Sequence, residues 1–216
     1  MTDPSDIILQ VDREPLRLHW PVGGNASGIL SFETGVRWRD FIGGLSIDPH
    51  TPHIVRVKFD RAQRLYLFGW IDFSLIKAGE LAALIALELA LMDRYGGALP
   101  KRKRSFAALL RHMVEADGLT DADMPMAVRC GGSVIGQLTG ETTPTLAERR
   151  NLLAHADPFD GLPTGGLLEL ARDLINYAYR NYIAEAAASA WTAVNRHPGE
   201  SALQDADSEQ WPLAPP

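Results

Sequence analysis

A chain of 216 residues with 46% apolar and 22% charged residues has the composition of a globular protein, either one domain with an appendage or two small domains. Its net charge of −6 argues against a protein that coats nucleic acid non-specifically, because such affinity comes from neutralising phosphates; a local basic patch is still compatible with it. The single cysteine, Cys130, excludes an intramolecular disulfide and a cysteine zinc cluster, and it is consistent with a reducing cytosol.

No membrane segment is expected. Residues 1–6 are acidic and lack the apolar core of a signal peptide. The longest apolar run, residues 81–92, is interrupted by Glu88 and is far shorter than the roughly 20 residues that a membrane span needs. We therefore expect a cytoplasmic protein.

Residues 1–71 are predicted as a β-rich N-terminal appendage. Short apolar segments at residues 16–20 and 28–32 each indicate a strand. Residues 53–59 alternate apolar and polar side chains, and residues 64–68 return after a turn, which predicts a β-hairpin. Because an isolated hairpin is marginal in water, at least three strands are expected to pack on the helical part.

Residues 72–195 are predicted as a helical domain. Its first helix is expected to begin near Asp72 or Ser74, either of which can cap it, and to end at Tyr95. Two glycines follow, the residue type that tolerates a left-handed helix end. The expected apolar face is broad and comprises Leu81, Leu84, Ile85, Leu87, Leu91 and Met92.

Glu88 lies on or beside this apolar face. A carboxylate buried there needs a cationic or hydrogen-bonding partner, since burial alone is strongly unfavourable. The alternative is an edge position that reaches water.

The densest basic run of the chain is Lys101, Arg102, Lys103 and Arg104. Two interpretations stay open: a solvated helix entrance, or a patch that binds substrate or a partner. A second helix is expected over residues 105–117 and is closed by Gly118-Leu119. Its inward side chains are predicted to be Phe106, Leu109, Leu110, Met113 and Val114.

Residues 120–144 are predicted as a long irregular loop, a feature that is usually functional or mobile. A third helix follows, which Thr145 can cap together with Glu148 in a capping box, Thr142 and Thr143 being alternatives. Pro158 disfavours helical geometry just before it, so this helix is expected to stop near Ala156.

The last helix is expected to run unbroken over residues 167–193. Residues 196–216 are predicted to be a flexible tail, because they contain prolines, acids and few apolar residues. The predicted inner face of the last helix is Leu167, Leu170, Ala171, Leu174, Ile175, Ala178 and Tyr182.

The third helix carries the one stretch of sequence that concentrates catalytic residue types: Arg149, Arg150, Asn151 and His155. On an ideal helix Arg150 and His155 are separated by about 140° and ~7.5 Å, so they do not share one face. The two side chains can converge where the helix frays or across a dimer interface.

These residues suit cleavage of RNA without a metal. Imidazole transfers protons near neutral pH, and guanidinium binds phosphate in a bidentate manner. The ribose 2′-hydroxyl would be the nucleophile, activated by His155, and Arg150 would stabilise the pentacoordinate phosphate. Asn151 would orient either residue or hold a phosphate oxygen.

The segment from Arg150 to His155 resembles the motif of the HEPN superfamily, an arginine and a polar residue followed by three residues of any type and a histidine. Residues 83–91 resemble the early glutamate-bearing helix of HEPN-like proteins. The resemblance covers residues 72–195. It implies an α+β, mainly α chain: a HEPN-like bundle of four to five helices, here preceded by a small antiparallel β region that lies outside the family pattern.

The resemblance also implies an activity. Active HEPN proteins are usually metal-independent endoribonucleases that work as homodimers, with motifs of both subunits lining one cleft, and leave a 2′,3′-cyclic phosphate. Many are toxins or antiviral defence effectors held in check by an antitoxin or regulatory protein. Carried over, Arg150 and His155 are catalytic and Asn151 is supporting, with no cofactor and no metal.

Other interpretations of the same residues stay open. His155 can complement the helix dipole, and the arginines can pair with Glu88, Glu148 or Asp157. Arg149 is predicted to be the structural partner of Glu88. The alternative function is a non-catalytic HEPN-like module for dimerisation or for binding a partner or nucleic acid, which the acidic net charge favours.

Overall fold

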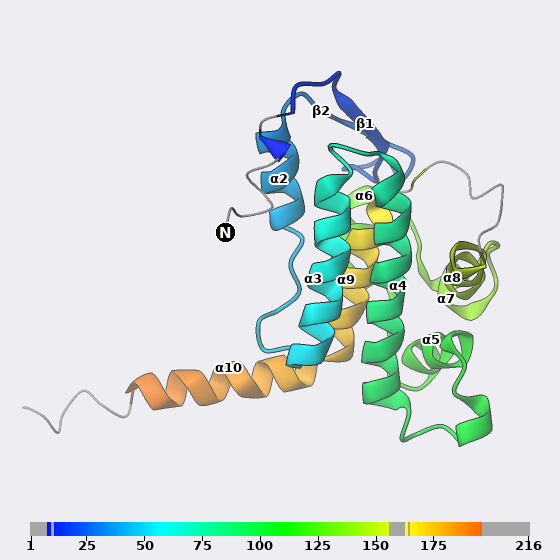
Figure 1. Cartoon of the computed structure of the whole chain (residues 1–216). Helices are drawn as coiled ribbons and strands as arrows, with labels where there is room; N and C mark the ends of the chain where they lie inside the picture. Colours follow the sequence, from blue (N-terminus) through cyan, green and yellow to red (C-terminus); the bar gives the residue numbers. More distant parts are fainter. Residues whose placement is uncertain (1–7, 10, 156–162, 164, 196–216) are drawn as a thin grey trace, which may run out of the picture.

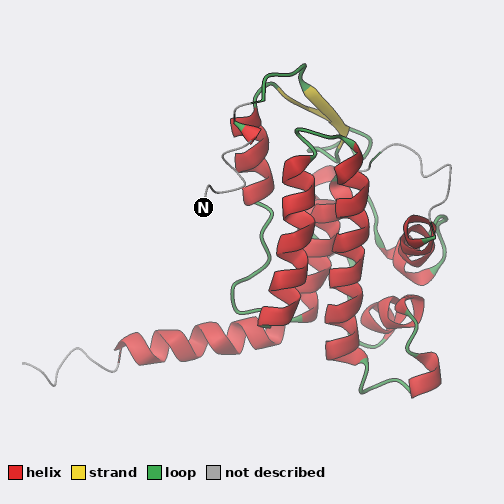
Figure 2. Cartoon of the chain, viewed as in Figure 1, coloured by secondary structure: helices red, strands yellow, loops and turns green. Residues whose placement is uncertain are grey.

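The computed structural model describes residues 8–9, 11–155, 163 and 165–195. This part of the chain is mostly helical and contains one two-stranded antiparallel sheet (Figures 1 and 2), which confirms the predicted mainly α class. The strands are β1 (Leu16–His19) and β2 (Ile29–Phe32). The helices are α2 (Gly35–Gly43), α3 (His53–Phe68), α4 (Ser74–Tyr95), α5 (Phe106–Glu115), α6 (Pro125–Cys130), α7 (Ile135–Thr139), α8 (Leu146–Ala154), α9 (Gly166–Ala178) and α10 (Arg180–Asn195), with 3-10 turns η1 (Lys101–Lys103) and η2 (Asp121–Asp123).

Both short strands are confirmed. They pair antiparallel, with Leu16 opposite Phe32 and His19 opposite Ile29. Leu16 and Leu18 point into the core while the residues between and after them are exposed, which is the alternation of a strand with one buried face.

The predicted hairpin over residues 53–68 is wrong, because this segment is the single helix α3. Its buried side chains recur every three to four residues, which is the helical period, and they are Val55, Phe59, Ala62 and Tyr66. Val57, which completes the apparent alternation with Val55 and Phe59, is exposed, as is Ile54. With α2 and α3 present, residues 1–71 are not β-rich.

Helix α4 is confirmed at Ser74–Tyr95. Its cap residue is Phe73, and the Asp72 carboxylate accepts hydrogen bonds from the backbone N (2.9 Å) and Oγ (2.7 Å) of Ser74. The helix ends at Gly96, but with a right-handed φ of −59°, so the expected left-handed ending is wrong. Leu84, Leu87 and Leu91 are buried as predicted, Leu81 and Met92 are half-buried, and Ile85 is exposed.

Helix α5 begins after the cap Ser105 and closes as expected, with Gly118 at φ +79° and the Leu119 N–H donating to the Met113 carbonyl. The predicted irregular loop over residues 120–144 is wrong, because it contains η2, α6 and α7. One carboxylate oxygen of Asp121 accepts from the backbone N of Val134 at 2.8 Å and thereby holds the link between α6 and α7.

The predicted last helix is two helices, because α9 ends at Ala178 and α10 starts at Arg180. Side chains at the break are tied to other elements: the Tyr179 hydroxyl donates to Asp93 at 2.7 Å, and Arg180 forms an ion pair with Asp117. Figure 1 shows α10 leaving the bundle, and Tyr182, predicted inward, is 48% exposed. The tail of residues 196–216 lies outside the described residues, as does Pro158. Helix α8 ends at Ala154, two residues before the predicted stop near Ala156.

Helices α3, α4 and α9 lie side by side in the centre of the bundle (Figure 1). One hydrophobic core joins residues on both sides of residue 71, including Trp20, Trp38 and Tyr66 before it and Leu84 and Leu174 after it. The N-terminal segment is therefore built into the bundle rather than appended to it. None of the described helices has the length and apolar character that would let it cross a membrane.

Candidate functional site

Helix α8 carries the predicted catalytic motif on the side of the bundle next to α4 (Figure 1). The capping box is confirmed: the Glu148 N–H donates to Thr145 Oγ1 at 3.0 Å, and the Thr145 N–H donates to the Glu148 carboxylate at 2.8 Å. Leu146 and Ala147 are buried and anchor the first turn. The start of α8 is thus determined locally, and its buried stripe sets which way the motif faces.

Arg150 is the partner of Glu88. Its Nε and Nη2 donate to one carboxylate oxygen of Glu88, at 3.0 and 2.7 Å. The pair is partly open to water, with side chains 30% and 26% exposed. The expectation that Arg149 pairs with Glu88 is wrong. Residues three and four positions apart lie on the same face of a helix. Arg150 therefore shares the face of the buried residues Leu146 and Ala147, which is the face toward α4.

Asn151 connects the ion pair to the outer face of α8. Its Oδ1 accepts a hydrogen bond from Arg150 Nη1 at 3.1 Å. Asn151 and His155 are four residues apart, and both line an open surface depression together with Pro144, Glu148 and Leu152. Arg150 is not among the residues that line this depression.

His155 is exposed and occupies the C-cap position of α8, where its backbone N–H donates to the Asn151 carbonyl. Within the described part of the chain its imidazole has no hydrogen bond or ion pair. No hydrogen bond joins the side chains of Arg150 and His155 there, in line with the angle expected on a helix. Asn151 is their common neighbour.

Arg149 lies on a third side of α8. It lines a cavity whose other walls come from α6, α7, α9 and the loop between the strands. Its Nε is buried and has no hydrogen-bond partner among the residues that the structure describes. Arg149 and Arg150 therefore project from different sides of α8, and only Arg150 forms hydrogen bonds with Glu88 and Asn151.

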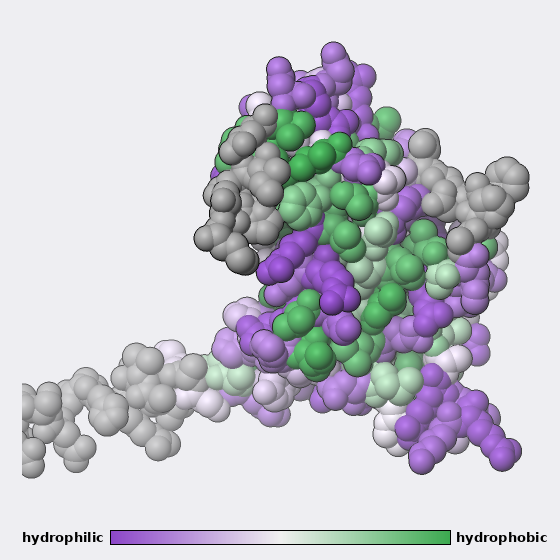
Figure 3. All heavy atoms as spheres, viewed as in Figure 1, coloured by the Kyte–Doolittle hydropathy of each residue, from purple (hydrophilic) through white to green (hydrophobic). Residues whose placement is uncertain are grey.

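The basic run lies in the connection from α4 to α5. Lys101, Arg102 and Lys103 are exposed, whereas Arg104 is half-buried and its Nε donates to the Leu99 carbonyl at 2.9 Å. In the view of Figure 1, α5 separates this connection from α8. Figure 3 shows a strongly hydrophilic projection there and hydrophobic surface over α3 and α4.

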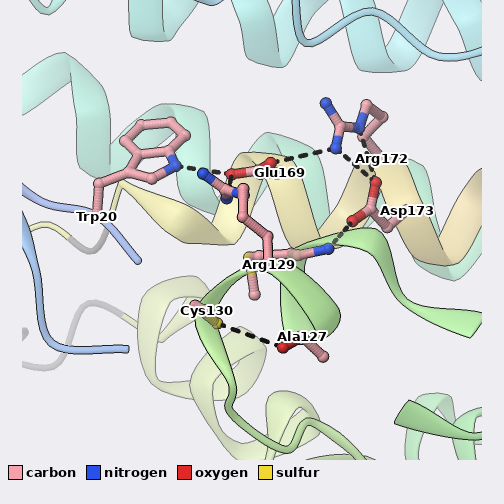
Figure 4. A network of polar contacts seen from close by, with 8 residues as sticks. Trp20, Ala127, Arg129, Cys130, Glu169, Arg172 and Asp173 are labelled. Carbon is pink, nitrogen blue, oxygen red and sulfur yellow. Dashed lines mark hydrogen bonds and ion pairs between the residues drawn. The ribbon is translucent and has the colours of Figure 1, made fainter. Parts of the chain in front are cut away.

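A buried polar network on α9 was missed by the sequence reasoning (Figure 4). The Glu169 carboxylate, whose side chain is 9% exposed, accepts from Trp20 Nε1 at 2.8 Å and from Arg129 Nη2 at 2.7 Å. Arg172 Nη2 donates to its other oxygen at 3.2 Å. Glu169 therefore joins the end of β1, α6 and α9.

Asp173 extends the same network. It accepts from Arg172 Nε at 2.8 Å and from the Met126 backbone N at 3.0 Å. Burial raises the pKa of the Asp173 carboxyl, and the nearby Arg172 opposes that shift. A sequence signal was present, since charges at Glu169, Arg172 and Asp173 are spaced three and four residues apart inside an apolar helix. Such a spacing predicts a buried charge pair.

No protein family, characterised protein or solved structure matches this chain. Within the residues that the structure describes, no group of three or more histidine, cysteine, aspartate and glutamate side chains is placed to hold a metal ion.

Proposed function

We propose that this protein is a metal-independent endoribonuclease of the HEPN type. The observation that carries the proposal is the position of Asn151, which holds the Arg150 guanidinium on one side and shares an open depression with His155 on the other. A guanidinium, an amide and an exposed imidazole are thereby linked along one helix.

The chemistry is a transesterification within RNA. His155 takes the proton of a ribose 2′-hydroxyl, whose oxygen attacks the adjacent phosphorus, and the bond to the 5′-oxygen of the next nucleotide breaks as that oxygen gains a proton from water. Arg150 uses three N–H groups on Glu88 and Asn151. Guanidinium has five, so two are left to neutralise charge on the phosphate.

The active unit is a homodimer with a composite site. Within one chain Arg150 and His155 face different directions, so a cleft formed by two copies of α8 would supply both groups to one phosphate. Leu152 is 44% exposed in the middle of the face that carries Asn151 and His155, which suits a contact between copies. Such an enzyme would suit a toxin or an antiviral defence effector that a regulatory protein restrains.

The test is cleavage of RNA by the purified full chain in EDTA. His155→Ala should lower the rate by about 10²- to 10⁴-fold, the usual contribution of a general base. His53→Ala is the matched control, because His53 is also exposed and at a helix end. The product should carry a 2′,3′-cyclic phosphate, and unchanged cleavage by the folded His155 variant contradicts the proposal.

The second candidate is a non-catalytic module that binds RNA or a partner. The observation in its favour is the Glu88 to Arg150 pair, which already engages the arginine that the reaction needs. Binding of RNA without cleavage, by wild type and by His155→Ala alike, would establish this alternative.

A further inference from the structure

The cavity beside Arg149 has the features of a ligand site. It has a volume of about 190 Å³. An apolar cavity of about 150 Å³ is enough to hold benzene, so this one accommodates a single ring or a short chain with a substituent. It is partly open to solvent and is lined by the loop after β1 and by α6, α7, α8 and α9, so five parts of the chain converge on it.

The walls are mostly apolar. Met126 and Ala127 come from α6, Val134 from the link to α7, and Leu167 and Leu170 from α9. Arg149 is the one charged side chain among the described residues that line it. The site thus combines a hydrophobic interior with a single positive charge.

That charge has no partner in the described part of the chain. Arg149 Nε is buried without a hydrogen bond, and no ion pair involves its guanidinium. Buried polar groups are nearly always hydrogen-bonded, and a cation facing apolar walls is unfavourable unless an anion or polar group compensates it. Arg149 is half-buried, and its guanidinium therefore has binding capacity that none of the described residues uses.

The neighbouring buried network does not supply the missing anion. Glu169 and Asp173 are occupied by Trp20, Arg129, Arg172 and a backbone N–H (Figure 4). Two carboxylates and two arginines balance one another there, so neither carboxylate of this network is left to pair with Arg149.

We infer that this cavity binds a small monocarboxylate, with the carboxylate on the Arg149 guanidinium and a ring or short alkyl chain against α6 and α9. Guanidinium and carboxylate match in a bidentate geometry. A phosphate dianion fits less well, because a single cation among mostly apolar walls cannot balance its two negative charges.

The walls are held in place before a ligand arrives. The Gly24 N–H donates to the Arg129 carbonyl at 3.1 Å and joins the strand loop to α6. Asp121 holds the Val134 N–H, and Asp173 holds the Met126 N–H. A preformed site loses little conformational entropy on binding.

The experiment uses the full chain with 4-fluorobenzoate as the probe, followed by ¹⁹F NMR. Saturable binding is expected, and Arg149→Met should weaken it by about 10- to 100-fold, the usual range for losing a charged hydrogen-bonded pair. The uncharged 4-fluorobenzyl alcohol should bind wild type and Arg149→Met equally. Arg61→Met is the matched control, since Arg61 is exposed on α3, and it should leave benzoate binding unchanged.

A second variant tests the place of binding. A Cβ on Gly132 would meet Cys130 Sγ at 3.5 Å and Ala26 Cβ at 3.6 Å, which is ordinary contact, and all three residues line the cavity. Gly132→Leu should fill the cavity and abolish binding of both probes while the chain stays folded. Equal benzoate affinity of wild type and Arg149→Met, or no saturable binding to wild type in the millimolar range, would overturn the inference.

Discussion

The arginine–glutamate contacts of Glu169 and of Glu88 differ in depth and in the number of their partners. Glu169 is nearly buried and accepts from three side chains of different elements, so it acts as a cross-link of the fold. Glu88 is about a quarter exposed, and it receives both of its hydrogen bonds from Arg150 alone. The comparison suggests that the first pair holds the fold together, while the second is open enough to serve a reaction.

The largest effect is expected at Glu169. Glu169→Ala leaves Arg129, Arg172 and the Trp20 N–H without their shared acceptor, and removing one partner of a buried ion pair lowers the free energy of unfolding by about 3–5 kcal/mol. Chemical denaturation measures this loss of unfolding free energy. Glu141→Ala, at an exposed position, is the control and should change stability by less than about 0.5 kcal/mol. If both substitutions lowered the free energy of unfolding equally, Glu169 would not be a cross-link of the fold, and its contrast with Glu88 would fail.

An intermediate case is Asp117, which receives two hydrogen bonds from Arg180, at 2.7 and 3.1 Å. Arg180, and secondarily the Tyr95 hydroxyl, lower the pKa of the Asp117 carboxyl. Asp117→Asn should lower the free energy of unfolding by about 1–3 kcal/mol at neutral pH.

The same pKa shift predicts a pH dependence. Because the folded pKa of Asp117 is depressed, its stabilisation is present above the unfolded pKa of about 3.9 and is lost as the pH falls through the folded value. The stability difference between wild type and Asp117→Asn should therefore shrink below about pH 4. A difference that is constant over this range would show that the ion pair does not act through the charge of Asp117.

The α8 site itself should be tolerant of change. Thr145→Ala removes the capping hydrogen bond and should lower stability by about 1 kcal/mol, measured by thermal or chemical unfolding. Ser105→Ala, which removes the equivalent cap of α5, is a matched comparison and should have a similar effect. A loss as large as that of Glu169→Ala would mean that the start of α8 is part of the structural core.

The smallest stability effect is expected at the open pair. Glu88→Gln should lower the free energy of unfolding by at most about 1 kcal/mol, as for partly exposed ion pairs. The same change should lower RNA cleavage, because Arg150 loses the carboxylate that orients it. If stability falls by several kcal/mol while cleavage is untouched, the pair is structural and the comparison with Glu169 fails.

Local signals determined much of this protein from the sequence. Strands β1 and β2, helix α4, the glycine end of α5 and the capping box of α8 were all predicted correctly, because each depends on residues within one or two turns. The angle between Arg150 and His155 followed from helix geometry alone.

Tertiary structure decided the rest. The β-branched residues of α3 imitate a strand, and only the burial of Val55, Phe59, Ala62 and Tyr66 against the bundle selects the helix. The break between α9 and α10 is held by side chains of α4 and of the loop after α5.

The choice between the two arginines was likewise made in three dimensions. Arg149 and Arg150 are chemically identical neighbours, and the sequence prediction assigned Glu88 to the wrong one. The buried stripe of α8 turns Arg150 toward Glu88 and Arg149 toward an apolar cavity. Sequence determined which side chains are available, while packing determined which of them meet, because contacts between distant segments depend on how every helix is oriented in the core.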